Sequence, residues 1–170
     1  MVIGILSDSH GDSDIVRQAL TALEQAGAER FVHCGDVGGM NVFDQFAGRN
    51  VDFVWGNMDC PDGVLLGYVT DLGLPLPTVP LSLELAGKRV AVCHGHEPCF
   101  RDIVFKGRHD YLLCGHTHER GDRRENGVRI INPGALHRAR VKTVATLDLA
   151  TDTLTFYALR DGRAEPVTAG

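Results

Sequence analysis

The chain has 170 residues, a hydrophobic content of 44% and a formal net charge of −5 at pH 7. Its length and ordinary composition predict one globular domain over residues 1–170 with a single substantial core. The negative charge argues against a stable nucleic-acid partner and against an anionic membrane surface, so an anionic substrate would need a local positive charge such as a metal.

The first half of the chain alternates predicted strands with predicted helices. Asp12 is a typical N-cap for a helix whose apolar residues recur at helical spacing until Gly27, and a short helix is predicted at Val42–Phe46. The strands predicted here are 2–7, 30–36 and 51–57. Strand–helix–strand order predicts parallel pairing with right-handed crossovers.

The second half predicts a loop, a hairpin and further strands. Its prolines indicate an extended loop over 73–80, and residues 81–94 predict a hairpin that turns at Ala86–Gly87. A short helix near Ile103–Lys106 precedes a strand over 110–118. Three consecutive antiparallel strands are expected at 127–134, 142–149 and 153–160. The predicted fold class is α/β, a sandwich of two mixed sheets flanked by helices.

Polar side chains follow five of the apolar runs, at the points where the predicted strands end. These clusters are Ser7-Asp8-Ser9-His10, Gly35-Asp36, Gly56-Asn57, His94-Gly95-His96 and Gly115-His116-Thr117-His118. Loops at the carboxyl ends of strands converge in open α/β sheets, so we expect all five clusters at one edge. In extended backbone, Asp8 would point the same way as His10, and His116 the same way as His118.

The donor types in these clusters predict a metal centre. Carboxylates, imidazoles and one amide oxygen, without a thiolate, suit Mn, Fe, Zn, Co or Ni better than a soft metal. Seven such side chains exceed the needs of one tetrahedral ion, and a carboxylate can bridge two. We therefore expect two divalent ions, roughly 3.5–4 Å apart, an arrangement that clamps a phosphoryl group. Each cluster alone has a plainer interpretation as a cap or turn, but their joint occurrence favours the metal centre.

The order of the five motifs resembles that of the calcineurin-like metallophosphoesterases, and their close spacing is most similar to the compact bacterial and archaeal phosphodiesterase branch. The resemblance runs from Val2 to about Pro133 and includes the turn Ile131–Ala135. It implies one metal held by Asp8, His10, Asp36 and His118, and a second held by Asp36, Asn57, His94 and His116, with Asp36 bridging. It also implies hydrolysis of phosphodiester bonds by a metal-bound hydroxide that attacks phosphorus in line, with manganese as the favoured metal.

Three residues are candidates for direct action on the substrate: Asn57, Asp59 and His96. Asn57 would contact a phosphoryl oxygen, and His96 would contact phosphate or transfer a proton, with a spacer role as the alternative. Many members of the family carry a histidine directly after the Gly-Asn motif, paired with the following carboxylate. Met58 stands there in this chain and cannot donate a proton, so Asp59 lacks the imidazole that it would orient.

Arg138 and Arg140 follow the Asn-Pro-Gly turn and could reach a phosphate, although solvated surface arginines are the commoner case. The expected substrate is a small phosphate ester or a nucleotide-like molecule, and a homo-oligomer is left open. Two other functions are compatible with the motifs. One is a phosphomonoesterase or protein phosphatase, and the other is a non-catalytic interaction scaffold similar to the retromer subunit of this family.

The N-terminal residues run directly into a strand without a basic segment, and no apolar run approaches the roughly 20 residues of a membrane helix. The five cysteines are odd in number and form no C-x-x-C pair. That usage is typical of a reducing compartment, so we expect a cytoplasmic protein in which cysteines near strand ends are small buried residues.

Overall fold

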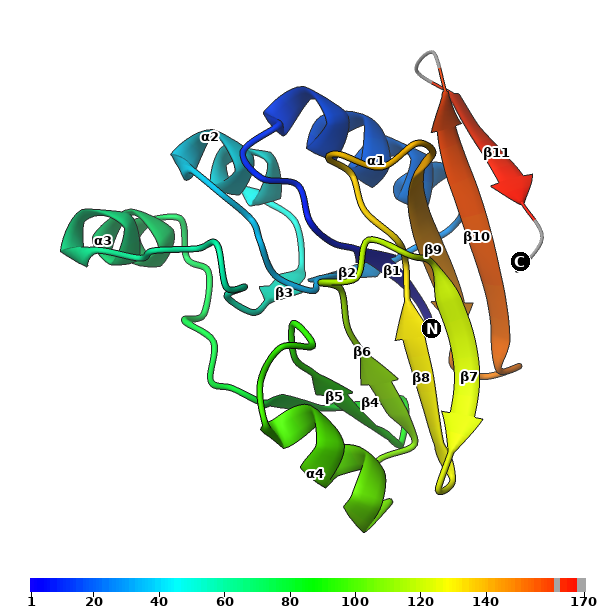
Figure 1. Cartoon of the computed structure of the whole chain (residues 1–170). Helices are drawn as coiled ribbons and strands as arrows, with labels where there is room; N and C mark the ends of the chain where they lie inside the picture. Colours follow the sequence, from blue (N-terminus) through cyan, green and yellow to red (C-terminus); the bar gives the residue numbers. More distant parts are fainter. Residues whose placement is uncertain (161–162, 168–170) are drawn as a thin grey trace.

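The computed structural model describes residues 1–160 and 163–167 and contains two mixed sheets that pack face to face between helices (Figure 1). Within these residues, six strands form the first sheet in the order β11-β10-β9-β1-β2-β3, and five form the second in the order β4-β5-β6-β8-β7. The predicted α/β sandwich is therefore confirmed. No helix among the described residues is both long enough and apolar enough to span a bilayer.

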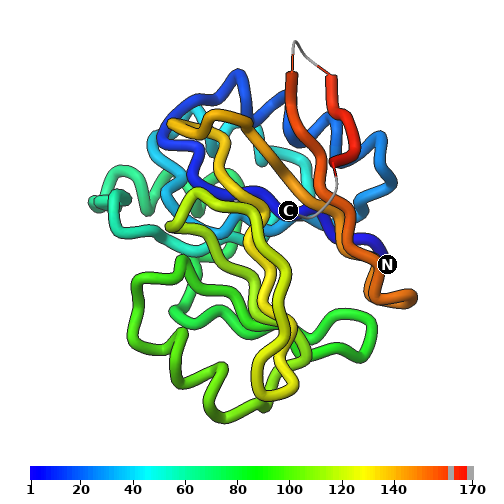
Figure 2. Tube along the Cα trace, turned by 45° about the vertical axis from the view of Figure 1, so that its right-hand side comes forward, coloured from blue at the N-terminus to red at the C-terminus, as the bar shows by residue number. Residues whose placement is uncertain are grey.

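The first sheet is built from the two ends of the chain and the second from its middle, as the colours of Figure 2 show. The first contains β1 (Val2–Leu6), β2 (Arg30–His33), β3 (Val51–Phe53), β9 (Lys142–Asp148), β10 (Thr153–Arg160) and β11 (Arg163–Val167). The second contains β4 (Leu81–Leu85), β5 (Lys88–Val92), β6 (Tyr111–Leu113), β7 (Gly121–Glu125) and β8 (Val128–Asn132). The helices are α1 (Ser13–Gln25), α2 (Met40–Phe43), the 3-10 turn η1 (Asp44–Phe46), α3 (Gly63–Asp71) and α4 (Cys99–Lys106).

Alternation along the strands divides the core into three layers. In β5, Val90 and Val92 are buried between the sheets, whereas Ala91 packs on the other face with Ile103 and Val104 of α4. The outer face of the first sheet packs against α1, α2 and η1. The inner strands of each sheet are therefore covered on both faces, which explains why β1 and β8 read as nearly continuous apolar runs.

The pairing of the N-terminal strands is as predicted, and that of the C-terminal strands is partly different. β1 pairs in parallel with β2, and β2 with β3. The prediction of three consecutive antiparallel strands was wrong for the first of them, β8. β8 lies in the second sheet, parallel to β6 and antiparallel to β7, whereas β9 and β10 form an antiparallel pair in the first sheet.

The sequence did not predict α3, β7 or β11. β7 has the sequence GDRRE, is mostly exposed and lies at the edge of its sheet, so it has no apolar alternation. β11 is also an edge strand and contains Pro166, which is unfavourable inside a sheet. The helices α2 and α4 begin earlier than expected, at Met40 and Cys99.

Candidate metal centre

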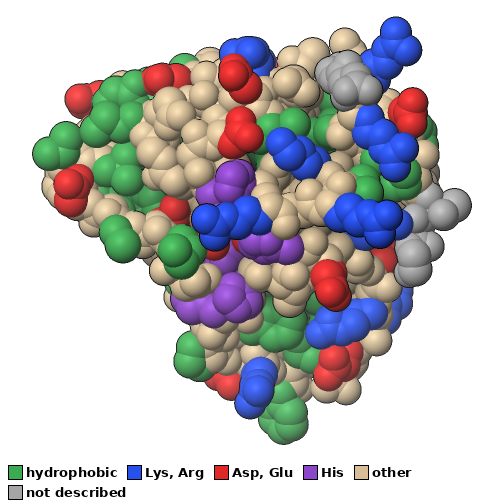
Figure 3. All heavy atoms as spheres, turned by 45° about the horizontal axis from the view of Figure 1, so that its top comes forward, with side chains coloured by type: hydrophobic (Ala, Val, Ile, Leu, Met, Phe, Trp, Pro, Cys, Tyr) green, Lys and Arg blue, Asp and Glu red, His purple; other side chains and the backbone are tan. Residues whose placement is uncertain are grey.

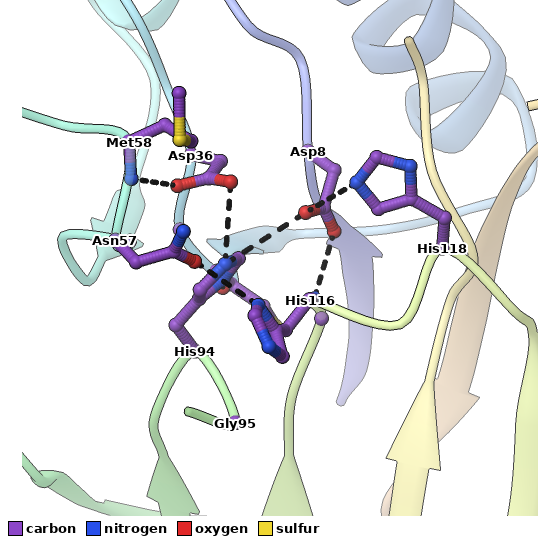
Figure 4. Close-up of polar contacts among 12 residues, drawn as sticks. Asp8, Asp36, Asn57, Met58, His94, Gly95, His116 and His118 are labelled. Atoms are coloured by element: carbon purple, nitrogen blue, oxygen red, sulfur yellow. Dashed lines mark hydrogen bonds and ion pairs between the residues drawn. The ribbon is translucent and has the colours of Figure 1, made fainter. Parts of the chain in front are cut away.

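The five polar clusters lie together, in the loops that follow β1, β2 and β3 of the first sheet and β5 and β6 of the second. The prediction of a common location is confirmed, but the location is the joint end of two sheets instead of the edge of one. Figure 3 shows histidine side chains gathered on one face of the molecule, and Figure 4 shows the carboxylates of Asp8 and Asp36 directed toward them.

The backbone at the clusters is not extended, contrary to our expectation. The φ angles are 55° at Asp8, 46° at His10, 71° at His116 and 60° at His118, in the left-handed region that side chains rarely adopt. Asp8 and His10 do lie together, through this turn. His116 and His118 diverge, because His118 lies beside Asp8 whereas His116 lies beside Asn57.

Backbone hydrogen bonds join the first two loops. The N–H of Asp8 donates to the carbonyl of Gly35 at 3.0 Å, and the N–H of His10 donates to the carbonyl of Asp36 at 2.9 Å. These bonds continue the parallel β1–β2 pairing beyond the ends of the strands. The two acidic clusters are therefore held in a fixed relation by main chain, independently of any side-chain contact.

Carboxylate oxygens lie between imidazole nitrogens in the centre of the site. Asp36 Oδ2 is 3.4 Å from His94 Nε2 and 3.6 Å from His10 Nε2. Asp8 Oδ1 is 3.2 Å from His118 Nε2 and 3.8 Å from His94 Nε2. The donor atoms form two groups that could each hold a metal ion, Asp8-His10-His118 and Asp8-Asp36-His94. Asp8 belongs to both groups. Asp36 belongs to the second group, and its Oδ2 also lies near His10 of the first.

Three of these atoms are buried without a hydrogen-bond partner among the described residues: Asp8 Oδ1, His10 Nε2 and His94 Nε2. A buried polar atom without a hydrogen-bond partner is costly, and three of them around the same pair of carboxylates are rare unless a ligand satisfies them. Burial lowers the pKa of His10, against the opposing influence of Asp36 and Asp8, which favours a neutral ring with a free lone pair. Donor chemistry and geometry both fit a divalent metal ion.

The orientation of His94 is set by main chain. Its Nδ1 lies 2.8 Å from the carbonyl oxygen of Cys34, which can only accept, so Nδ1 carries the proton. The ring then directs Nε2 toward Asp8 and Asp36. A metal-binding histidine typically has such a partner on its other nitrogen. Glu97 holds the same loop, because its carboxylate accepts from the N–H groups of His94 and Gly95.

Two glycines allow the loops to approach one another closely. A Cβ at Gly35, where φ is +98°, would lie 2.6 Å from Nδ1 of His94. A Cβ at Gly115 would lie 2.6 Å from Oδ2 of Asp8. Real Cβ contacts are never this short, so side chains here would displace two of the predicted metal ligands.

The residues after β3 surround Asp36. The N–H of Met58 donates to Asp36 Oδ1 at 2.8 Å, while the Met58 side chain is 64% exposed. Asp59 accepts from three backbone N–H groups, those of Val37, Gly38 and Gly56. Burial raises the pKa of Asp59, and these hydrogen bonds oppose the rise. Asp59 thus joins the loop after β3 to the loop that carries Asp36.

The two other candidates for substrate contact lie at the surface of the site. Asn57 Oδ1 is 3.0 Å from Nδ1 of His116 (Figure 4). The His96 ring lies 5.8 Å from the ring of His116 and 5.5 Å from that of His94, centroid to centroid, with a side chain that is 37% exposed. His96 is therefore adjacent to the metal-binding groups and open to solvent.

Several supporting residues were not found from the sequence. Asn132, in the predicted Asn-Pro-Gly turn, donates from Nδ2 to the carbonyl of Gly115 and to Thr117 Oγ1, and so supports the His116–His118 loop. The ring of His137 lies 5.4 Å from that of His10. Neither residue belongs to one of the five polar clusters. Asn132 lies in the turn Ile131–Ala135, which resembles a turn of the family, and that resemblance was the signal that could have identified it.

Comparison with known proteins agrees with this geometry. Residues 1–152 match the family model of the calcineurin-like phosphoesterase superfamily domain. The chain belongs to this superfamily. A phosphodiesterase from Methanocaldococcus jannaschii is 29% identical over 154 residues, which cover 87% of this chain and 93% of that protein.

Solved structures with the superfamily fold are similar over nearly the whole chain. An archaeal phosphodiesterase is 26% identical with a TM-score of 0.84, covering 94% of this chain and 100% of that one. Vps29 from Entamoeba histolytica, solved with zinc, is 21% identical with a TM-score of 0.71, covering 98% of this chain and 97% of that one. The second likeness concerns the fold alone.

Proposed function

We propose that this chain is a phosphodiesterase that requires two divalent metal ions. The observation that carries the proposal is the convergence of buried, unpartnered Asp8 Oδ1, His10 Nε2 and His94 Nε2 at the joint end of the two sheets. Membership of the superfamily supports hydrolysis of phosphate esters, and the phosphodiesterases at 29% and 26% identity support diesters as the substrate.

We assign the metal ligands as the motifs predict. One ion would be held by Asp8, His10, Asp36 and His118, and the other by Asp36, Asn57, His94 and His116, with manganese favoured. The position of Asp36 Oδ2 between Nε2 of His10 and Nε2 of His94 supports its bridging role. Bound divalent ions would supply Lewis-acid polarisation of the phosphoryl group and a water of lowered pKa.

The remaining side chains act on the substrate or on the loops. The amide nitrogen of Asn57 is available to donate to a phosphoryl oxygen while its oxygen faces His116. His96 is placed to contact phosphate or to transfer a proton at the open side of the site. Asp59 acts as a positioning residue, because its carboxylate binds three backbone N–H groups of the loops around Asp36.

Turnover of bis(p-nitrophenyl) phosphate and of p-nitrophenyl phosphate, measured with Mn²⁺, Ni²⁺, Zn²⁺ or chelator, tests the proposal. We expect metal-dependent hydrolysis of the diester that exceeds hydrolysis of the monoester. A faster monoester reaction would favour a phosphomonoesterase or protein phosphatase. Absence of turnover with every metal would favour an interaction scaffold, and the likeness to Vps29 makes that outcome the natural alternative.

We also propose a cytoplasmic location and action as one domain over residues 1–170. All five cysteines lie in the described part of the chain and are unpaired. Cys34, Cys93 and Cys114 are buried in the core beside the strands that they follow. Thiols kept in this state are typical of a reducing compartment.

A further inference from the structure

A cleft of about 500 Å³ opens directly beside the candidate metal centre. Its inner end is formed by Gly95, Gly115 and Thr117, which lie in the same loops as four of the site histidines. None of the seven predicted metal ligands lines it. The cleft therefore adjoins the loops of the centre without including its predicted ligands, and its volume lies in the range of small-molecule sites.

The floor of the cleft is apolar. It is formed by Phe100 in the first turn of α4, Cys114 after β6 and Ile130 of β8. Phe100 is only partly buried against the outer core layer. The guanidinium of Arg123 lies over the Phe100 ring, 5.9 Å from its centroid. An aromatic face beside a guanidinium is a surface on which planar rings stack.

The cleft is open beside β7 because the residue of that strand that faces it next to Arg123 is a glycine. Arg123 projects toward Phe100 and α4, whereas Asp122 projects to the opposite face, where it binds Arg129. Gly121 lies two residues before Arg123 and so shares its face. A Cβ at Gly121 would meet nothing within 4 Å, so this position borders open space. In Figure 3, hydrophobic side chains lie beside the histidines, with charged side chains at their outer edge.

We propose that this cleft binds an aromatic ring, phenyl-like or a nucleobase, that belongs to the phosphate-ester substrate. With the phosphoryl group at the metal centre, the ring would lie against Phe100 and Arg123, and the backbone of Gly95 and Gly115 would allow a flat group to pass. This inference deepens the proposed function and depends on it for the position of the phosphate. It names an aromatic phosphate ester as the substrate class.

The test compares phenyl phosphate with methyl phosphate, which share the phosphate and differ in the ring. Their dissociation constants are measured by titration calorimetry on the full-length, Mn²⁺-loaded protein. We expect phenyl phosphate to bind on the order of tenfold more tightly. Phe100→Leu, which keeps apolar volume without a π face, and Gly121→Leu, which fills the cleft, should each bring this ratio close to one while methyl phosphate binds as before.

Two matched variants control for general effects. Phe105→Leu changes the same helix at a residue that is 83% exposed and does not line the cleft. Gly67→Leu places the same side chain at another glycine with open space around it, on α3. Both should retain the native ratio. Gly121→Leu keeps the test decisive if Phe100→Leu does not fold.

A native ratio near one, or a ratio that neither cleft variant changes, would overturn the proposal. An equal loss in the control variants would do the same. The outcome is separable from the proposed function. Hydrolysis of esters with no preference for the ring would refute the cleft alone, whereas a preference for the ring in a protein without turnover would refute the phosphodiesterase alone.

Discussion

Ser9 Oγ and His33 Nε2 lie 2.9 Å apart in the buried layer directly behind the metal centre. Ser9 Oγ also donates to the carbonyl of Val37, so it accepts from the imidazole. Gly35 N–H donates to the other ring nitrogen at 3.3 Å. The neutral ring of His33 therefore joins the loop that carries Asp8 to the loop that follows β2, and protonation would break this arrangement.

The pH dependence of stability should report this buried ring. Burial, with smaller contributions from His94 and His10, lowers the pKa of His33 to about 3, from 6.5. Between pH 6.5 and 3, His33 binds a proton in the unfolded chain but stays neutral in the folded chain, so the free energy of unfolding falls as the pH falls. The slope from this group is up to about 1.4 kcal/mol per pH unit, and it vanishes above pH 6.5. The free energy of unfolding is measured by urea titration across this pH range for the metal-free native protein and for His33→Gln. Its slope against pH should be smaller in His33→Gln by this amount, and equal slopes in the two proteins would contradict the prediction.

Metal content should approach two divalent ions per chain. The three unpartnered buried atoms and the seven ligand side chains motivate this number. Reconstitution with Mn²⁺ or Ni²⁺ followed by elemental analysis measures it, and thermal unfolding should shift to higher temperature with metal because only the folded chain holds the site. Trace metal after reconstitution would show that the ligand assignment is wrong.

Asp36→Asn should reduce turnover more than any other single ligand change. Its Oδ2 lies within 3.6 Å of one imidazole nitrogen of each proposed metal set, so both ions depend on its charge. Loss of a residue that only supports a metal ligand typically costs 10–100-fold in affinity or activity. Because Asp36 is proposed to bind both ions directly, we expect its loss to reduce turnover by more than about 100-fold. The matched control is Asp14→Asn on the exposed first turn of α1. Near-native turnover of Asp36→Asn at saturating metal would exclude the bridging role.

Met58→His should speed hydrolysis of alkyl diesters more than that of aryl diesters. Position 58 is exposed and follows Asn57, and Asp59 Oδ1 accepts a single N–H, so it can still orient an imidazole. General-acid assistance is worth typically 10²–10⁴-fold and matters most for leaving alcohols of high pKa. Both rates are measured across a pH series at fixed Mn²⁺, with Met58→Gln as control. A uniform change in both rates would indicate that another group, such as His96, already donates the proton.

The architecture and the ligand types could be predicted because both depend on local sequence. Continuous apolar runs identify strands covered on both faces, and the polar cluster that follows each run identifies its carboxyl end. β7 and β11 could not be predicted in this way, because edge strands with exposed side chains need no apolar pattern. The placement of β8 also depended on tertiary structure, since its apolar sequence suits either sheet.

Within the site, the sequence by itself determined which atoms can bind metal, because donor type belongs to the residue. Only the tertiary structure decided how they meet. The left-handed turns at Asp8 and His10 exist because backbone hydrogen bonds hold them against Gly35 and Asp36 in the loop after β2. The partners of His94, His33 and Asn132 are carbonyls, N–H groups and hydroxyls from other loops, and any residue supplies a carbonyl. The main-chain contacts leave no pattern in the sequence, and the hydroxyl contacts of Ser9 and Thr117 are recognised only when the fold brings distant loops together.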